Sequence, residues 1–161
     1  MSTTPVAGPI LGIVLGLALA VFGVPAAREI YGLSIPASRW VEIRSVEVLD
    51  AEAGTVPEVL IDWSIHRPFL ADWTATVRRK SGEGFYAFCG RSGVSDYRPG
   101  SVFPSHSDLF WWLGIPPHPL CPELPPGEYL FTVVLTLRLD ALPPKTVRVE
   151  SNVFTIHEAS Q

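Results

Sequence analysis

The first 27 residues of this chain contain no charged side chain. All 12 Lys and Arg residues and all 16 Asp and Glu residues therefore lie in residues 28–161. The formal net charge is −4, so the chain has no basic excess. That argues against a nucleic-acid binder, because such proteins present a basic face to the phosphates. An apolar leader is thus followed by one domain of ordinary globular composition.

Catalytic signatures are also missing. The sequence has no G-x-S-x-G nucleophile turn, no phosphate-binding glycine loop and no dinucleotide fingerprint. Ser105 and His106 are adjacent in the chain, which is a poor geometry for a nucleophile and its base. We therefore expect a protein that is not an enzyme, with a cell-wall-active hydrolase as the least favoured function.

The apolar leader is long enough to cross a membrane. Residues 6–27 read VAGPILGIVLGLALAVFGVPAA and have no charged or hydrogen-bonding side chain. As a helix they span roughly 33 Å, against a bilayer core of about 30 Å. We expect a transmembrane anchor within residues 1–27, in contact with membrane lipid, and a linker over 28–38. The alternative is a signal peptide cleaved near Ala20, but the apolar run continues past that point.

Two signals disagree about the orientation of this anchor. Arg28, Arg39 and Arg44 follow the apolar run and no basic side chain precedes it, which favours a cytoplasmic domain. Long domains, however, translocate largely regardless of charge, and a pair of cysteines favours an oxidising compartment. We expect a single-pass protein of the inner (cell) membrane with an extracytoplasmic, periplasmic domain.

Small residues recur every four positions in the leader, at Gly8, Gly12, Gly16 and Ala20. Positions four apart lie on one face of a helix, and small residues there let two helices approach closely in lipid. The pattern favours a homo-oligomer packed through this face. The alternative is that Gly and Ala are simply frequent in membrane helices.

After residue 38 the hydrophobic pattern alternates with period two, which is typical of strands. The clearest runs are 59–65, 73–77 and 129–137, and Leu109–Leu113 is expected to be a further strand. The alternation slips at Arg44–Ser45, which predicts a β-bulge. About seven short strands within residues 39–157 predict an all-β domain, an immunoglobulin-like β-sandwich.

Local features support this sandwich. The sequence Pro-Pro-Gly-Glu before Tyr129 resembles the corner of such folds where a tyrosine hydroxyl bonds back to the preceding turn. Residues 151–156 resemble a common last strand of these folds. Trp63 and Trp73, on adjacent strands, are expected to fill the space between the sheets.

Cys89 and Cys121 are the only cysteines, and they bracket a Pro-, Gly- and Ser-rich segment. An even pair behind an export-type leader predicts a disulfide. Closing this loop would stabilise the fold by roughly 3.5–4 kcal/mol in the loop-entropy model. A zinc site that adds His106 and His118 to the cysteines matches no familiar spacing, so we expect no metal and no cofactor.

The segment between the two cysteines is rich in aromatic residues. They either form a minor core or present a contact surface to a protein partner, because aromatic residues are enriched at interface cores. The candidate partner-binding residues are Tyr97, Phe103, Phe110, Trp111 and Trp112.

The sequence from Cys89 to Gly100, the pair Trp111-Trp112, Cys121 and the stretch Leu124–Tyr129 resemble small membrane-anchored proteins of tailed bacteriophages and prophages. The resemblance implies an immunoglobulin-like domain behind a membrane segment and brings no activity or site residues. We therefore expect a membrane-anchored interaction module that binds a protein partner or assembles with itself. The alternative is a structural accessory subunit of a membrane complex or virion.

Overall fold

The computed structural model describes residues 13, 16, 17, 19–100, 106–114, 121, 123–140 and 142–159. The chain divides into two compact units. The first comprises Met1–Pro36 with Asp140–Pro143, and the second comprises Ala37–Leu139 with Pro144–Gln161.

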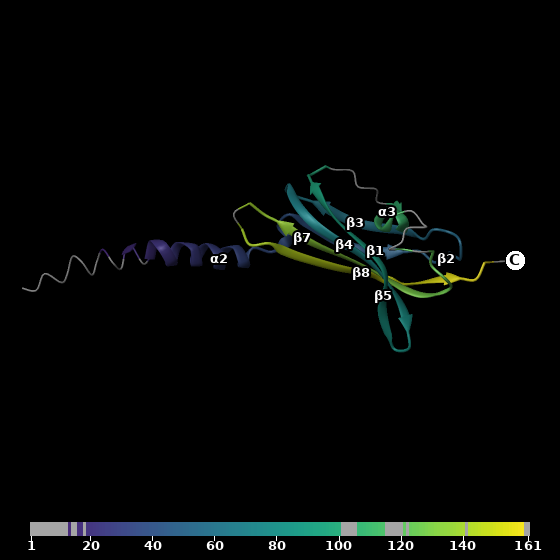
Figure 1. The fold of residues 1–161 in the computed structure, drawn as a ribbon. Helices are drawn as coiled ribbons and strands as arrows, with labels where there is room; N and C mark the ends of the chain where they lie inside the picture. Colours follow the sequence, from purple (N-terminus) through teal and green to yellow (C-terminus); the bar gives the residue numbers. More distant parts are fainter. Residues whose placement is uncertain are drawn as a thin grey trace, which may run out of the picture. The chain divides into compact units, whose positions relative to one another are not determined.

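The described part of the first unit is mainly helical. A π-helical turn, Leu19–Gly23, leads into α2, Val24–Ser34 (Figure 1). Helix α2 ends at Ser34 because Ile35 takes an extended backbone, the conformation that a following proline imposes. Residues 28–34, expected as part of a linker, are therefore helical.

Helix α2 includes a position that only glycine can occupy. Gly32 is buried, and a Cβ placed on it would lie 2.4 Å from Cδ of Pro143. Any side chain at this position would displace the proline that lies against the helix.

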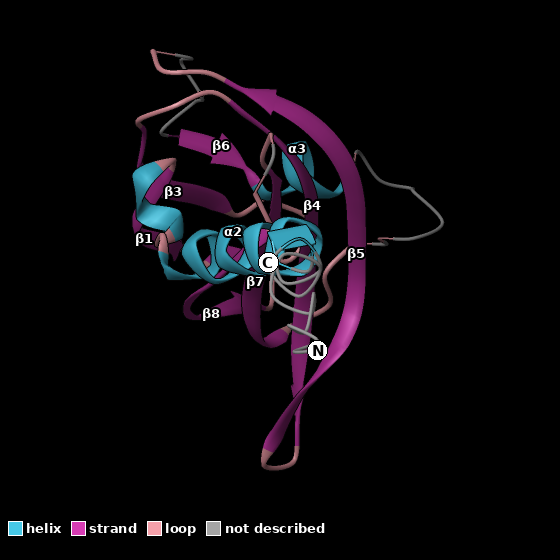
Figure 2. Cartoon of the chain, turned by 90° about the vertical axis from the view of Figure 1, so that its left-hand side faces the viewer, coloured by secondary structure: helices cyan, strands magenta, loops and turns pink. Residues whose placement is uncertain are grey.

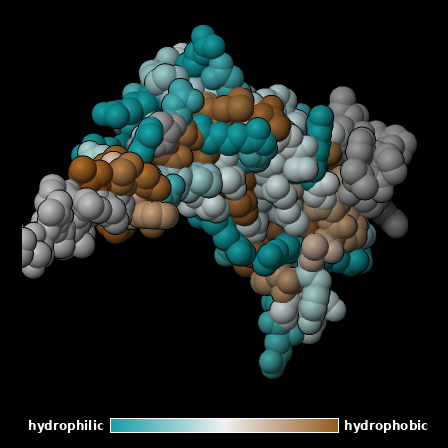
Figure 3. Space-filling view, turned by 60° about the vertical axis from the view of Figure 1, so that its left-hand side comes forward, coloured by the Kyte–Doolittle hydropathy of each residue, from teal (hydrophilic) through white to brown (hydrophobic). Residues whose placement is uncertain are grey.

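Most of the large apolar side chains described in this unit are exposed, and Figure 3 shows brown, hydrophobic surface along the helix. They are Ile13, Leu17, Leu19, Val21, Phe22, Val24, Ile30, Tyr31 and Leu33. Of the four small residues spaced along the leader, Gly16 and Ala20 are exposed, while Gly8 and Gly12 lie outside the described residues. Among the described residues, no helix is both long and apolar enough to cross a membrane.

The second unit is mainly β and contains two sheets, the larger of which is strongly curled (Figure 2). The smaller sheet has the order β1 (Val41–Val48), β3 (Glu58–Ile65) and β6 (His106–Asp108). The larger sheet has the order β2 (Ala51–Glu52), β8 (Lys145–His157), β7 (Gly127–Arg138), β4 (Phe69–Ser81) and β5 (Gly84–Tyr97). All pairings are antiparallel except the one between β2 and β8, and a 3₁₀ turn, Ala37–Arg39, precedes β1.

The core follows the period-two pattern of the sequence. Odd-numbered side chains of β4 and β7 point inward, and most of the apolar ones are almost fully buried, whereas Trp73 is half-buried. The core members on these two strands are Phe69, Ala71, Ala75, Val77, Tyr129, Phe131, Val133, Leu135 and Leu137. The expected bulge is confirmed, because the β1–β3 register shifts between Ile43 and Ser45.

The expected hydrogen bond from Tyr129 to the preceding turn is also confirmed. The Tyr129 hydroxyl donates a hydrogen bond to the Pro125 carbonyl at 2.6 Å, at the start of β7. The Tyr129 ring is buried and stacks on Phe154 of β8, with 5.7 Å between the ring centroids. The bond therefore fixes the turn before β7 to the core beneath it.

One expected strand is a helix. Leu109–Leu113 forms the short helix α3, not a strand. Asp108 caps it, because its side chain accepts a hydrogen bond from the Trp111 backbone N–H at 2.6 Å. The helix stops at Gly114, whose φ of 92° is a conformation that glycine adopts without strain.

Candidate functional site

Helix α3 holds its side chains in fixed positions against the larger sheet. It contacts β4, β5 and β6 (Figure 2). Leu109, Trp112 and Leu113 are buried and anchor the helix, whereas Trp111 is 50% exposed. The exposed Trp111 indole therefore lies on a helix whose N-terminus is capped and whose other face is packed against the domain.

Trp112 is the central anchor. It is 5% exposed, and its indole N–H donates to the Ser107 hydroxyl at 3.0 Å. Its ring makes edge-to-face contacts with Trp73 at 6.3 Å and with Trp111 at 5.0 Å between centroids. Such pairs are favourable beyond the area they bury, so the three indoles stabilise one arrangement.

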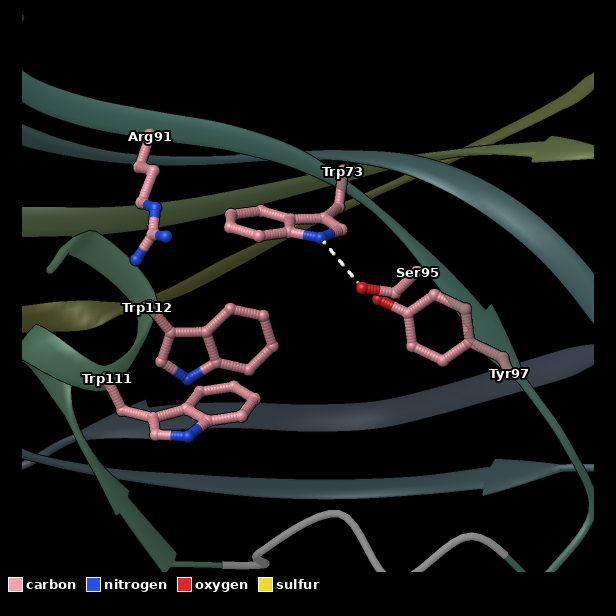
Figure 4. A pocket seen from close by; sticks show the side chains of 6 residues that line it. All are labelled: Trp73, Arg91, Ser95, Tyr97, Trp111 and Trp112. Atoms are coloured by element: carbon pink, nitrogen blue, oxygen red, sulfur yellow. Dashed lines mark hydrogen bonds between the residues drawn. The ribbon is translucent and has the colours of Figure 1, made fainter.

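The opposite wall comes from the inner face of β4 and β5. The register places Trp73 directly opposite Gly93, and a Cβ on Gly93 would lie 2.7 Å from the Trp73 ring. The Trp73 indole therefore lies across the glycine, and its N–H donates to the Ser95 hydroxyl at 3.0 Å (Figure 4). Gly93 is required here for close approach.

Tyr97 closes one end of this wall. It is 2% exposed, stacks on Phe69 with centroids 4.9 Å apart, and meets Trp63 edge-on at 5.9 Å. Burial raises the pKa of its hydroxyl above the usual value, and a hydrogen bond with Ser95 opposes that effect. The Tyr97 hydroxyl is therefore uncharged at neutral pH.

A cavity of about 220 Å³ remains between α3 and this wall (Figure 4). Its lining residues are Trp73, Arg91, Ser95, Tyr97, Trp111 and Trp112. Arg91 is the only charged group among the described lining residues, and its side chain lies on the same face of β5 as Ser95 and Tyr97. The cavity is thus an aromatic box with one cation at its edge.

The sequence identified half of this box. Tyr97, Trp111 and Trp112, proposed as partner-binding residues, do lie together around the cavity, although only Trp111 is substantially exposed. Phe110 is half-buried, and Phe103 lies outside the described residues.

Sequence reasoning missed Trp73, Arg91 and Ser95 as lining residues. The tight turn after Ser81 pairs Ser81 with Gly84, but a bulge between Val77 and Arg78 shifts the β4–β5 register by one residue, so the turn alone does not predict that Trp73 lies opposite Gly93. Trp73 and Trp63 were expected as full core residues, but both are only half-buried.

The expected disulfide is confirmed. Cys89 of β5 is bonded to Cys121, with α-carbons 4.8 Å apart, somewhat closer than the 5.5–6 Å that is most common. Both residues are buried. The bond ties the end of the aromatic segment to the strand that forms the cavity wall.

A second hollow lies at the tip of the β4–β5 hairpin, between Arg79 and Phe88. Its cations are already engaged, because Arg79 donates to the Pro126 carbonyl at 3.0 Å and Lys80 pairs with Glu128. The aromatic box is therefore the better candidate for a binding site.

No metal-binding cluster of three or more His, Cys, Asp or Glu side chains occurs among the described residues. Both cysteine sulfurs are committed to the disulfide. Comparison of the sequence with models of known protein families and with curated proteins gives no match.

Proposed function

We propose that this protein is a membrane-anchored, extracytoplasmic interaction module of immunoglobulin-like fold, which binds a protein partner through the surface formed by α3 and β5. The observation that carries the proposal is the exposure of Trp111. A large aromatic ring stands half in solvent, on a helix whose other large side chains are mostly buried. Large aromatic residues of this kind are the usual anchors of protein interfaces.

The strand order supports the immunoglobulin-like fold. Three consecutive antiparallel strands, β4, β7 and β8, with β5 at the edge, correspond to the sheet that carries the C, F and G strands in such domains. β1, β3 and β6 correspond to the A, B and E strands of the opposite sheet. The Tyr129 bond at the start of β7 lies where the tyrosine corner of these domains lies.

The membrane anchor and its orientation rest on the first unit and on the cysteines. Residues 6–27 carry no charge, and their large described side chains are exposed, so an apolar surrounding would stabilise them. The Cys89–Cys121 bond suits an oxidising compartment outside the cytoplasm. The resemblance to proteins of tailed phages and prophages supports an origin in such a genome.

The test places a photo-crosslinking amino acid at position 111 of the full chain in its native membrane. Tyr86 is the matched control, because it is a 64% exposed aromatic residue at the hairpin tip, away from α3. We expect one discrete crosslinked protein from position 111 and none from position 86. Equal crosslinking at both positions, or none at 111, would overturn the proposal.

Substitution separates contact from folding. Trp111→Ala should remove partner capture with little change in melting temperature, because half of the ring is already in solvent. Trp112→Ala should cost about 3–5 kcal/mol of stability, as for other buried tryptophans. If Trp111→Ala unfolds the domain as Trp112→Ala does, the exposed ring is a packing residue.

A further inference from the structure

We propose that the aromatic box binds the C-terminal residue of the partner protein, with an aromatic ring inside the cavity and the terminal carboxylate on Arg91. This inference rests on the proposed function, since it identifies the part of the partner that the α3–β5 surface would recognise.

The size of the cavity selects a single ring. A closed apolar cavity of about 150 Å³ accommodates benzene, whereas drug-sized ligands occupy roughly 300–1,000 Å³. The 220 Å³ of the box therefore suits one aromatic ring with a short attachment. A longer ligand would have to continue outside it.

The walls select an aromatic group over a sugar. Trp73, Trp111 and Trp112 offer ring faces and edges, and aromatic pairs gain from such geometry. The indole N–H groups of Trp73 and Trp112 already donate to Ser95 and Ser107. A sugar entering the box would lose hydrogen bonds to water that these groups cannot replace.

The charge selects an anion. Among the described residues that line the box, Arg91 is the only ionisable group besides the neutral Tyr97, and none is a carboxylate. Within the part of the chain that the structure describes, Arg91 has no hydrogen-bond or ion-pair partner of its own. A guanidinium presents a planar pair of donors that matches a carboxylate. A ring and a carboxylate a few atoms apart occur together at a C-terminal aromatic residue.

The cavity also opens in the right place. Arg91 and Trp111 are the two exposed members of its lining, so they mark its mouth. A chain whose last residue lies in the box would leave past Trp111, onto the surface proposed to contact the partner. The ring would then be enclosed while the carboxylate stays at the rim beside Arg91.

The test uses the full chain in detergent micelles and calorimetric titration with short peptides. The reference peptide ends in phenylalanine with a free carboxylate. Two comparison peptides change one feature each, a C-terminal amide in one and a terminal alanine in the other. We expect each comparison peptide to bind at least about tenfold more weakly, the loss that follows from removing a charged hydrogen bond or a buried ring.

Variants assign the carboxylate to Arg91. Arg91→Gln should lower the affinity of the free-acid peptide to that of its amide and leave the amide unchanged. Arg148→Gln is the control, because Arg148 is an exposed arginine on β8 that pairs with Glu150, and it should change neither affinity. Equal binding of acid and amide, no effect of Arg91→Gln, or no binding at millimolar peptide would each overturn the inference.

The free acid 3-phenylpropionate distinguishes a peptide terminus from a small aromatic acid. Binding of this acid with no binding of any peptide would overturn the assignment to a partner's C-terminus. If no peptide binds but position 111 still crosslinks to one protein, this inference is wrong and the proposed function still stands. Conversely, peptide binding without any crosslink at position 111 would overturn the proposed function and would still show that the cavity binds peptides.

Discussion

Asn152 pairs with both backbone groups of Val48 although the two residues belong to different sheets. The Val48 N–H donates to Asn152 Oδ1 at 2.8 Å, and Asn152 Nδ2 donates to the Val48 carbonyl at 2.9 Å. One side-chain amide thus replaces the neighbouring strand that Val48 lacks at the edge of the smaller sheet. Val48 is 1% exposed, so these groups have little access to water.

Asn152→Ala should lower the free energy of unfolding by about 2 kcal/mol, because it leaves a buried N–H and a buried carbonyl unpaired. Asn152→Asp keeps the acceptor for the Val48 N–H but places a carboxylate oxygen against the Val48 carbonyl oxygen, so it should cost at least as much. Urea denaturation at neutral pH measures both. An alanine variant as stable as the parent would show that water replaces the amide.

Tyr129→Phe should lower the free energy of unfolding by about 1 kcal/mol, because it removes the bond to the Pro125 carbonyl while the stacked ring remains. Thermal denaturation is the measurement. Tyr86→Phe serves as the control, since Tyr86 is exposed and should be neutral. Equal melting temperatures for the parent and the Tyr129→Phe variant would contradict a stabilising corner.

Alkaline pH should destabilise the domain through its buried tyrosines. Burial raises the pKa of Tyr97 and of Tyr129, for which nearby Arg79 offsets part of the effect. The unfolded chain then loses these protons first, at about pH 10. Stability is therefore unaffected by these groups below about pH 10 and falls as the pH rises toward their folded-state pKa values. Urea midpoints between about pH 8 and 11 should show this decline, and the decline should be shallower in Tyr129→Phe.

Removing the disulfide should cost about 3.5–4 kcal/mol in the loop-entropy model. The double variant Cys89→Ala with Cys121→Ala and the reduced parent should have similar denaturation midpoints. Reductant should leave the double variant unchanged, which controls for nonspecific effects. Mass analysis that finds two free thiols in exported protein would show that the bond does not form there.

Several features of the fold were predictable because local chemistry determines them. Period-two alternation identified the long strands, and its slip at Arg44–Ser45 located the bulge. The two cysteines and the turn before Tyr129 predicted bonds that the structure contains. Each of these signals can be read from a few neighbouring residues or, for the disulfide, from the presence of only two cysteines.

The remaining features depend on partners far apart in the sequence. The five residues of α3 are too few to show helical periodicity, so the apolar run at 109–113 looked like a strand and only Asp108 marked the helix start. The cavity depends on the register between β4 and β5, and the Asn152–Val48 bonds join residues 104 positions apart. No local pattern reveals such pairings.

The overlap of Trp73 and Gly93 has a consequence for how related sequences can vary. A side chain at position 93 is tolerated only if the ring at position 73 becomes smaller, since the two would occupy one volume. Substitutions at these positions should therefore be correlated across homologues, with glycine at 93 wherever a large aromatic residue stands at 73. Trp111, at the mouth of the box, is not part of this overlap, so divergence at position 111 can reshape the mouth while the floor stays the same.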